Sequence, residues 1–293
     1  MIPENDLPHG HSTPFDAVAR EYDATFTHTA VGRLLRLRVW ALLRRLTANT
    51  HPTTVLELNC GTGEDALWLA RQGWRVLATD ISQEMVDLAR EKAAQAGLEE
   101  QVRVEVCAIE EIGRYKHSPD GKGDTTPFFP SGVRLIFSNF GGLNCLSPGA
   151  IQNLSTDIQL LMPESGLFAA VVMSRFCLWE TLYFLLKGKP RQAFRRLGNS
   201  PLDVRLDEGT NVSTRYYSPA EFRRLAGGGA QRTFVIHPVG FWLPPSYLHP
   251  FFEKYPRFLR LLNYLEKNCA PAWLAPFADH FFISFNPAPP LIR

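Results

Sequence analysis

The feature that most constrains the fold is an apolar strand that runs directly into a glycine turn and then into a helix. The segment 55–58 has the pattern of a buried strand, Gly61 and Gly63 follow it, and a helical pattern covers 65–72. Such a turn lets a ligand approach the backbone closely and offers it the free amides of a helix N-terminus. The stretch therefore predicts a ligand site where a sheet strand ends.

Strand and helix patterns continue to alternate beyond this turn. Buried strands are predicted at 55–58, 75–79, 102–107, 133–138 and 167–173, and the helices between them at 65–72, 83–96 and 150–161. Short apolar strands that alternate with helices are typical of βαβ units and of a parallel sheet. The predicted fold class is α/β: a doubly wound, mostly parallel sheet with helices on both faces.

Two segments before this alternation and one within it have other patterns. Residues 1–14 are polar, contain three prolines and are expected to be flexible. The segment 31–46 carries an apolar stripe at helical spacing with arginines on the opposite arc, so it predicts an amphipathic helix whose arginines face solvent. The segment 116–132 is rich in Pro, Gly, Asp, Ser and Thr and is expected to be a surface loop.

The alternation stops after the fifth strand. A helix at 178–186, a hairpin around 204–217 and a short helix at 219–226 are predicted, and an insertion of this length is expected to cap the strand ends. Two further strands are predicted at 232–237 and 280–286, joined by a proline-rich connection that rigid turns shape. In terms of domains, 15–293 is predicted to be a single domain, with 15–46 as a helical lid and 175–230 as the cap.

Composition excludes several classes of protein. The 31 basic and 29 acidic side chains leave a net charge of +2, which argues against a dedicated nucleic-acid binder. No basic and apolar leader pattern is visible, so a cytoplasmic protein is expected. Arg175 and Glu180 interrupt the most apolar window, so no transmembrane helix is expected. The arginine-rich helix leaves peripheral membrane contact open. The five scattered cysteines form no Cys-x-x-Cys pair, so neither a disulfide framework nor a metal site is indicated.

The acid at the end of the second strand narrows the ligand class. Asp80 follows Gly61 by 19 residues, the distance at which an acid can accept hydrogen bonds from a ribose. The turn also satisfies the Gly-x-Gly-x-x-Ala dinucleotide pattern, so an NAD-dependent oxidoreductase is the alternative. A pyrophosphate at this helix would face Glu64 and Asp65, whereas a ligand with an ammonium and a sulfonium would be attracted to them.

These motifs together resemble the class I S-adenosylmethionine-dependent methyltransferases of the small-molecule type. The segment 57–63 is similar to their acid-x-Gly-x-Gly-x-Gly motif, 78–82 to their second strand and 137–141 to their fourth-strand motif. The resemblance covers about 15–174 and implies a Rossmann-like sheet and S-adenosyl-L-methionine as cofactor. Asn59 stands where the family has its first glycine, and asparagine is among the residues that accept a positive φ.

The resemblance also implies roles for individual residues. The methionine portion of the cofactor would be held by Glu57, Asn59, Cys60, Gly61 and Gly63, the ribose by Asp80, and the adenine by Ile81, Met85, Ala108, Ile109 and Glu110. Ser138, Asn139 and Phe140 would border the transferred methyl group, and Phe15 and Tyr22 would belong to a lid over the cofactor. The predicted acceptor contacts are Phe15, Phe140, Asn144, Trp179 and Tyr216.

Methyl transfer from a sulfonium is an in-line displacement, so the protein mainly has to align donor and acceptor. A general base is needed only when the acceptor loses a proton, and His280 is the candidate, although its neighbour Asp279 would point to the opposite face of a strand. The aromatic residues of the cap favour a small hydrophobic or planar acceptor over a nucleic acid or protein. A non-catalytic nucleotide-binding scaffold remains the third hypothesis. The acceptor atom and the oligomeric state are not specified by the sequence.

Overall fold

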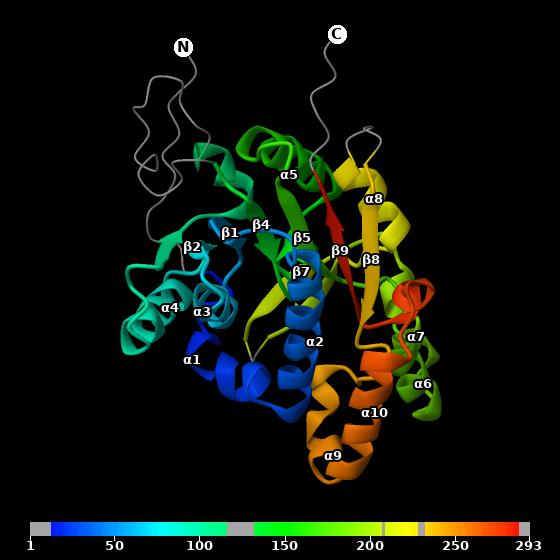
Figure 1. Cartoon of the computed structure of the whole chain (residues 1–293). Coiled ribbons are helices and arrows are strands. Elements are labelled where there is room, and N and C mark those ends of the chain that lie inside the picture. The colour runs from blue at the N-terminus through cyan, green and yellow to red at the C-terminus, as the bar shows by residue number, and fades with distance from the viewer. Residues whose placement is uncertain (1–12, 116–131, 207–208, 228–231, 287–293) are drawn as a thin grey trace.

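A computed structural model describes residues 13–115, 132–206, 209–227 and 232–286. Its centre is a seven-stranded sheet with the order β3-β2-β1-β4-β5-β9-β8 (Figure 1). These strands are β1 (Thr54–Leu58), β2 (Arg75–Asp80), β3 (Val102–Val106), β4 (Leu135–Ser138), β5 (Leu167–Met173), β8 (Phe234–Val239) and β9 (His280–Phe285). The expected flexible start and the expected surface loop lie almost wholly outside the described residues.

Two features of the sheet matter for the site: its strand order reverses between β1 and β4, and β9 is its one antiparallel strand among the described residues. Strands β1 to β5 pair in parallel, while β9 runs antiparallel to both β5 and β8. The order reverses between β1 and β4, and in open α/β sheets ligands bind at that point, outside the carboxyl ends of the strands. The doubly wound, mostly parallel sheet predicted from the alternation is confirmed.

Helices cover both faces of the sheet, each with its own apolar core. One core packs the sheet against α2 (Ala30–Leu46), α3 (Glu64–Arg71), α4 (Gln83–Gln95) and α10 (Pro256–Asn268). The other core packs it against α5 (Pro148–Leu161) and α8 (Pro219–Gly227). Side-chain caps fix where several helices begin: Thr29, Ser82 and Ser147 each accept a hydrogen bond from the backbone amide three residues later.

Shorter elements lie before and after the fifth parallel strand. The chain enters through α1 (Ala19–Tyr22) and a π-helical turn, η1 (Asp23–Thr27). The region after β5 contains α6 (Leu178–Leu186), α7 (Pro190–Ala193), the 3₁₀ turn η4 (Arg195–Leu197) and a hairpin of β6 (Leu202–Arg205) and β7 (Asn211–Thr214). The remaining 3₁₀ turns are η2 (Ile109–Tyr115), η3 (Gly142–Cys145), η5 (Ser246–Leu248) and η6 (Ala272–Phe277). No helix of the described residues is long and apolar enough to cross a bilayer.

The connection between the last two strands differs from the prediction. Rigid turns were expected there, but it contains α9 (His249–Glu253) and the thirteen-residue helix α10. Pro250 and Pro256 stand in the first turns of these helices, where the missing N–H of proline costs nothing. The prolines therefore begin helices here instead of excluding them.

Two arginines of α2 also contradict the expectation of a solvated face. Arg36 and Arg38 are only 7% and 6% exposed. Arg36 pairs with Asp65 of α3, and Arg38 lies 4.0 Å from Glu266 of α10. Both partners are distant in sequence, so helical periodicity alone could not reveal that this arc of α2 is covered.

Candidate functional site

The glycine turn between β1 and α3 has the backbone that close ligand approach requires. Asn59, Gly61 and Gly63 have φ values of 47°, 53° and 83°. Asn59 therefore adopts the positive φ that its position demands, as expected. Its side chain also ties the turn to the end of β4, because its Nδ2 donates to the carbonyl of Asn139 at 2.6 Å and its Oδ1 accepts from Ser138 at 2.6 Å. A Cβ at Gly142 would lie 2.1 Å from the Asn59 Cγ, so this contact requires glycine there.

Asp80 at the end of β2 is oriented by backbone amides. Its Oδ2 accepts from the Gly61 amide at 2.8 Å, and its Oδ1 accepts from the Ser82 amide at 3.0 Å. Burial raises the pKa of Asp80 above its usual value, and the amide hydrogen bonds oppose that rise. The carboxylate is thus held rigidly beside the turn, with acceptor capacity left for a ligand hydroxyl.

A cavity of about 330 Å³ opens over the carboxyl ends of the strands. The predicted site residues that line it are Phe15, Tyr22, Asn59, Gly61, Asp80, Ile81, Met85, Ile109, Glu110 and Phe140. They come from the N-terminal segment, from the end of β2 and from the segments that follow β1, β2, β3 and β4, so the tertiary structure brings them to one place. Phe140 adopts a φ of 43°, a strained conformation of the kind that collects at functional sites.

The hairpin β6–β7, part of the insertion expected to cap the strand ends, supplies a wall of the cavity from residues that the sequence analysis did not name. Val204, Leu206, Val212 and Thr214 line it, together with Met173 at the end of β5. The i, i+2 spacing in each strand places these hairpin residues on one face. This alternation was the sequence signal that could have identified them as cavity-lining residues. None of the cap aromatics expected to form the acceptor pocket lines this cavity.

Several predicted site residues do not line the cavity. Among the predicted cofactor residues, Cys60, Gly63, Ala108, Glu57, Ser138 and Asn139 do not line it. Ser138 and Asn139 are buried, and their side chains hold Asn59 and Asp65 respectively. These two residues therefore fix the shape of the turn from behind.

The predicted acceptor residues Asn144, Trp179 and Tyr216 are also away from the cavity lining. Asn144 is fully buried and hydrogen-bonds the backbone of Met173 and the carbonyl of Arg215, which attaches the hairpin to β5. Trp179 donates to the carbonyl of Trp242, and Tyr216 lies beneath the guanidinium of Arg196. Their contacts are those of structural residues.

The acidic side chains near the turn differ in whether a cation pairs with them. Asp65 accepts hydrogen bonds from Arg36 and Trp40, and Glu64 pairs with Lys92 at 2.9 Å. Because these cations neutralise Glu64 and Asp65, the two acids do less to repel a pyrophosphate or to attract a sulfonium ligand than the sequence analysis expected. Glu57 is different, because it is 1% exposed and its Oε2 has no hydrogen-bond partner among the described residues.

Burial raises the pKa of Glu57 well above its usual value, and the nearby charge of Asp65 adds to the rise. A buried carboxyl group in this state gains most from a cation that enters the site. The thiols of Cys60 and Cys107 also have raised pKa values, again chiefly through burial, which does not suit them to act as nucleophiles.

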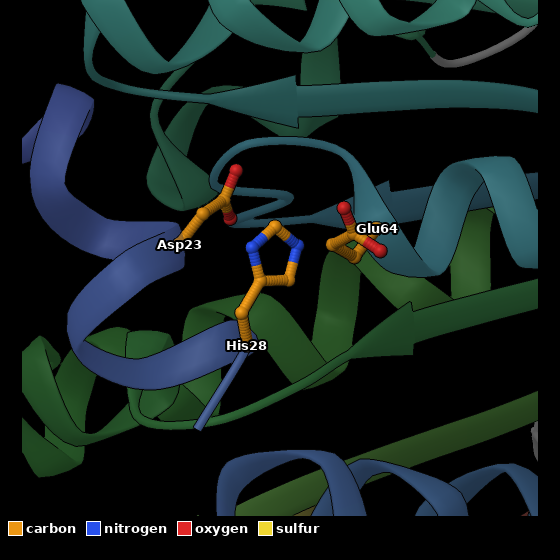
Figure 2. A group of neighbouring side chains, drawn as sticks. All are labelled: Asp23, His28 and Glu64. Atoms are coloured by element: carbon orange, nitrogen blue, oxygen red, sulfur yellow. The ribbon is translucent and has the colours of Figure 1, made fainter. Parts of the chain in front are cut away.

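A cluster of possible metal ligands lies beside the turn (Figure 2). One ligand atom from each of Asp23, His28 and Glu64 lies within 4.8 Å of the others. The ammonium group of Lys92 already pairs with Asp23 at 2.5 Å and with Glu64 at 2.9 Å. These carboxylates are neutralised within the protein, so we assign no metal to the cluster.

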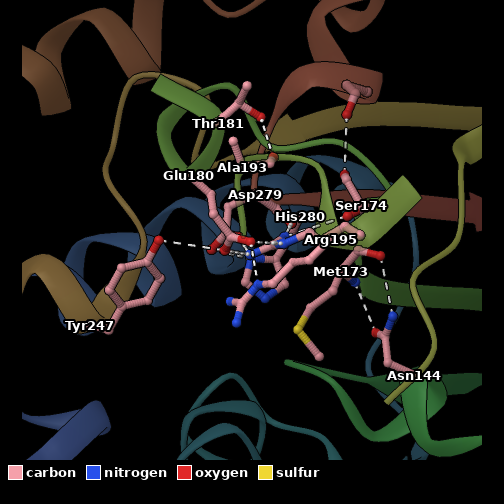
Figure 3. Close-up of polar contacts among 12 residues, drawn as sticks. Asn144, Met173, Ser174, Glu180, Thr181, Ala193, Arg195, Tyr247, Asp279 and His280 are labelled. Carbon is pink, nitrogen blue, oxygen red and sulfur yellow. Dashed lines mark hydrogen bonds and ion pairs between the residues drawn. The ribbon is translucent and has the colours of Figure 1, made fainter. Parts of the chain in front are cut away.

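His280 begins β9 next to the cavity wall. It is 8% exposed, pairs in register with Met173, and its ring lies edge-on to that of Phe140 with 5.5 Å between centroids. His280 Nδ1 lies 3.2 Å from Asp279 Oδ2 (Figure 3), so the expected separation of the two side chains is wrong. Asp279 precedes the strand, and the alternation of faces does not apply to it.

A buried ion-pair network holds Asp279 in turn. Arg196 Nη2 lies 2.9 Å from Asp279 Oδ1 and 2.7 Å from Glu180 Oε2. Burial would raise the pKa of Asp279, but the charges of His280 and Arg196 outweigh it and hold this pKa well below its usual range. These ion pairs connect Glu180 and Arg196, which lie between β5 and the hairpin, to Asp279 beside His280.

Comparisons with known proteins agree with this geometry. Residues 55–166 match the family model described as a methyltransferase domain. Over 107 residues the chain is 27% identical to the tRNA 5-carboxymethoxyuridine methyltransferase of Escherichia coli K12, a match that covers 36% of this chain and 41% of that protein.

Solved structures resemble the chain over nearly its whole length. The CcbJ methyltransferase from Streptomyces caelestis is 18% identical, with a TM-score of 0.57 and coverage of 96% of this chain and 100% of that one. DhpI in its complex with SAH is 18% identical, with a TM-score of 0.54 and coverage of 94% of each chain. At these identities the likeness shows a shared fold.

Proposed function

We propose that the chain, whose residues 55–166 match the model of a methyltransferase domain, transfers a methyl group from S-adenosyl-L-methionine to a small, apolar acceptor. The observation that carries the proposal is the glycine turn, with Asp80 bound to the Gly61 amide, at the edge of a cavity. In this proposal Asp80 binds the ribose hydroxyls, and the apolar side chains of Ile81 and Met85 pack on the adenine. The in-line displacement then needs chiefly a fixed geometry of donor and acceptor.

The balance of charge supports a sulfonium cofactor. The buried Glu57 has no hydrogen-bond partner for its Oε2 in the part of the chain that the structure describes, while Glu64 and Asp65 already pair with cations. An ammonium group near Glu57 would compensate this carboxyl, whereas a pyrophosphate would gain nothing from it. We therefore favour S-adenosyl-L-methionine over NAD.

The walls of the cavity support a small acceptor. Val204, Leu206 and Val212 of the hairpin line it together with Phe15 and Phe140, so an acceptor would meet aliphatic and aromatic side chains. We propose that 15–46 acts as a lid and 175–230 as a cap of a single domain. The tRNA acceptor named for the Escherichia coli relative is a polymer, and the described residues that line the cavity include no lysine or arginine to bind its phosphates.

Calorimetry with S-adenosylmethionine, S-adenosylhomocysteine and NAD tests the cofactor. We expect the first two to bind and NAD not to bind. Binding of NAD alone would replace the proposal with an oxidoreductase, and binding of none of the three would favour a scaffold.

Asp80→Ala should weaken S-adenosylhomocysteine binding by about 1 to 3 kcal/mol, because the ribose hydroxyls lose their acceptor and the turn loses its hydrogen bond. Titration calorimetry measures the change. Asp87→Ala is the matched control, since Asp87 is an exposed acid of the neighbouring helix α4 and contacts Arg90 and Gln83. Equal affinities for the wild type and the Asp80 variant would reject this site.

Cofactor binding should release a proton from Glu57. Its raised pKa keeps part of the carboxyl protonated in the free protein, and a bound ammonium would lower that pKa. Affinity should then rise with pH until the pH exceeds the pKa of the free protein. Calorimetry in buffers of different ionisation enthalpy detects the proton, and Glu57→Gln should abolish the buffer dependence. A wild-type binding heat that is the same in every buffer would contradict the prediction.

A further inference from the structure

One end of the molecule exposes apolar side chains and cations together. It consists of two segments, 178–197 and 246–277, which we call the basic apolar face. Figure 1 places α6, α9 and α10 near one another at this end. Ring contacts connect the two segments: Trp179 with Phe252 at 5.7 Å between centroids, and Phe176, just before the first segment, with Phe277 at 6.0 Å.

The outer side of α6 is aliphatic. Leu182, Leu185 and Leu186 follow one another at i, i+3 and i+4, which places them on one stripe of the helix. Their exposed fractions are 49%, 43% and 89%. Such a stripe is costly to leave in water, and contiguous exposed apolar surface marks an interaction site.

Helix α10 has apolar residues on two sides. Leu259 and Leu262 are buried against the core, while Phe258, Leu261 and Tyr264 are 45%, 51% and 61% exposed. The side of α10 that faces away from the core therefore also exposes apolar and aromatic residues. Phe and Tyr with Leu on a helix surface suit the boundary between lipid headgroups and acyl chains.

Cations surround these apolar residues. The segment 178–197 contains five basic residues and one acid, and the segment 246–277 contains four basic residues and two acids. Glu180, Glu266 and Arg196 are buried, which leaves eight exposed basic residues and one exposed acid, Glu253, in the two segments. The face is thus clearly positive although the chain as a whole is nearly neutral.

We propose that the basic apolar face docks on an anionic lipid surface, with the leucines and aromatic rings entering the interface and the lysines and arginines contacting the headgroups. An anionic bilayer offers both the negative charge and the apolar layer that this face complements. A second copy would bring like charges together, and a nucleic acid would leave the leucine stripe of α6 in water. This docking is independent of the proposed methyl transfer.

The test is sedimentation of the full chain with two kinds of vesicle, phosphatidylcholine alone and phosphatidylcholine with an equal amount of phosphatidylglycerol. We expect binding to the anionic vesicles, weakened by high salt, and little binding to the neutral ones. Lys187→Glu with Lys189→Glu should lower the binding constant by about fivefold or more per cation. Leu182→Ser with Leu185→Ser and Leu186→Ser should lower it by about tenfold or more.

Leu160→Ser is the matched control, because Leu160 is 60% exposed on α5, which covers the sheet in the other core. All variants are first checked for an unchanged unfolding temperature. The proposal is overturned by equal sedimentation with both vesicle types, or by anionic-vesicle binding that the lysine and leucine variants leave unchanged. Binding of mixed tRNA that is lost in the lysine variant but kept in the leucine variant would instead assign the face to RNA, and a dimer that the leucine variant dissociates would assign it to a second copy.

Discussion

His280→Ala should lower the turnover of a hydroxyl acceptor by about 10²- to 10⁴-fold and leave cofactor affinity nearly unchanged. The imidazole does not itself line the cavity but lies beside Phe140 and Met173, which do. Its Nδ1 is 3.2 Å from Asp279 Oδ2 and forms no hydrogen bond among the described residues. A histidine at this place can accept the proton that the acceptor loses. The variant should also lose the acidic limb of the pH profile, because that limb reports protonation of the base.

His237→Ala is the matched control for this experiment. His237 lies on the edge strand β8, is partly buried, and pairs in register with Phe282, which does not line the cavity, so turnover should persist in its absence. Steady-state rates over a range of pH measure methyl transfer, and calorimetry with the cofactor measures its binding, so the two effects can be told apart. If His280→Ala reduces stability but the folded fraction turns over normally, His280 is structural and the acceptor needs no base from this position.

Arg196→Met should destabilise the fold by about 3 to 5 kcal/mol at neutral pH. The guanidinium is 7% exposed overall and pairs with both Glu180 and Asp279, so its removal leaves two buried carboxylates with too little compensation. Urea unfolding measures the change. Arg195→Met provides a close control, because Arg195 pairs with the same Glu180 but is more exposed, and its loss should cost about 1 kcal/mol or less.

The effect of Arg196→Met should depend on pH in one direction. The charge of Arg196 helps to hold the pKa values of Asp279 and Glu180 below their usual range, against the opposing effect of burial. A carboxyl with a lowered pKa in the folded state adds stability above its unfolded pKa of about 4, and this contribution disappears as the pH falls through the folded value. The difference between wild type and variant should therefore shrink below about pH 4. A difference that stays constant down to acid pH would show that packing, and not charge, is lost.

Local sequence patterns were sufficient to predict the parallel sheet and the glycine turn. Five parallel strands and their helices follow from apolar runs and glycines that depend only on near neighbours in sequence, and the structure confirms them. The positive φ of Asn59 could be anticipated in the same way, because it reflects what one residue type tolerates. Helix α10 was missed because its prolines were interpreted as turn formers without regard to their place in the first turn of a helix.

What only the tertiary structure decided was which side chains meet. Arg36 was assigned to solvent on periodicity, but Asp65 from another helix pairs with it and buries it. Asp279 and His280 contact each other because the chain bends before the strand begins. Sequence determined the strands and helices of the parallel sheet and the backbone of the turn, since those depend on local sterics and periodicity. The electrostatic state of Glu57 and the apolar wall from the hairpin depend on burial and on contacts between distant segments, and these exist only once the chain has folded.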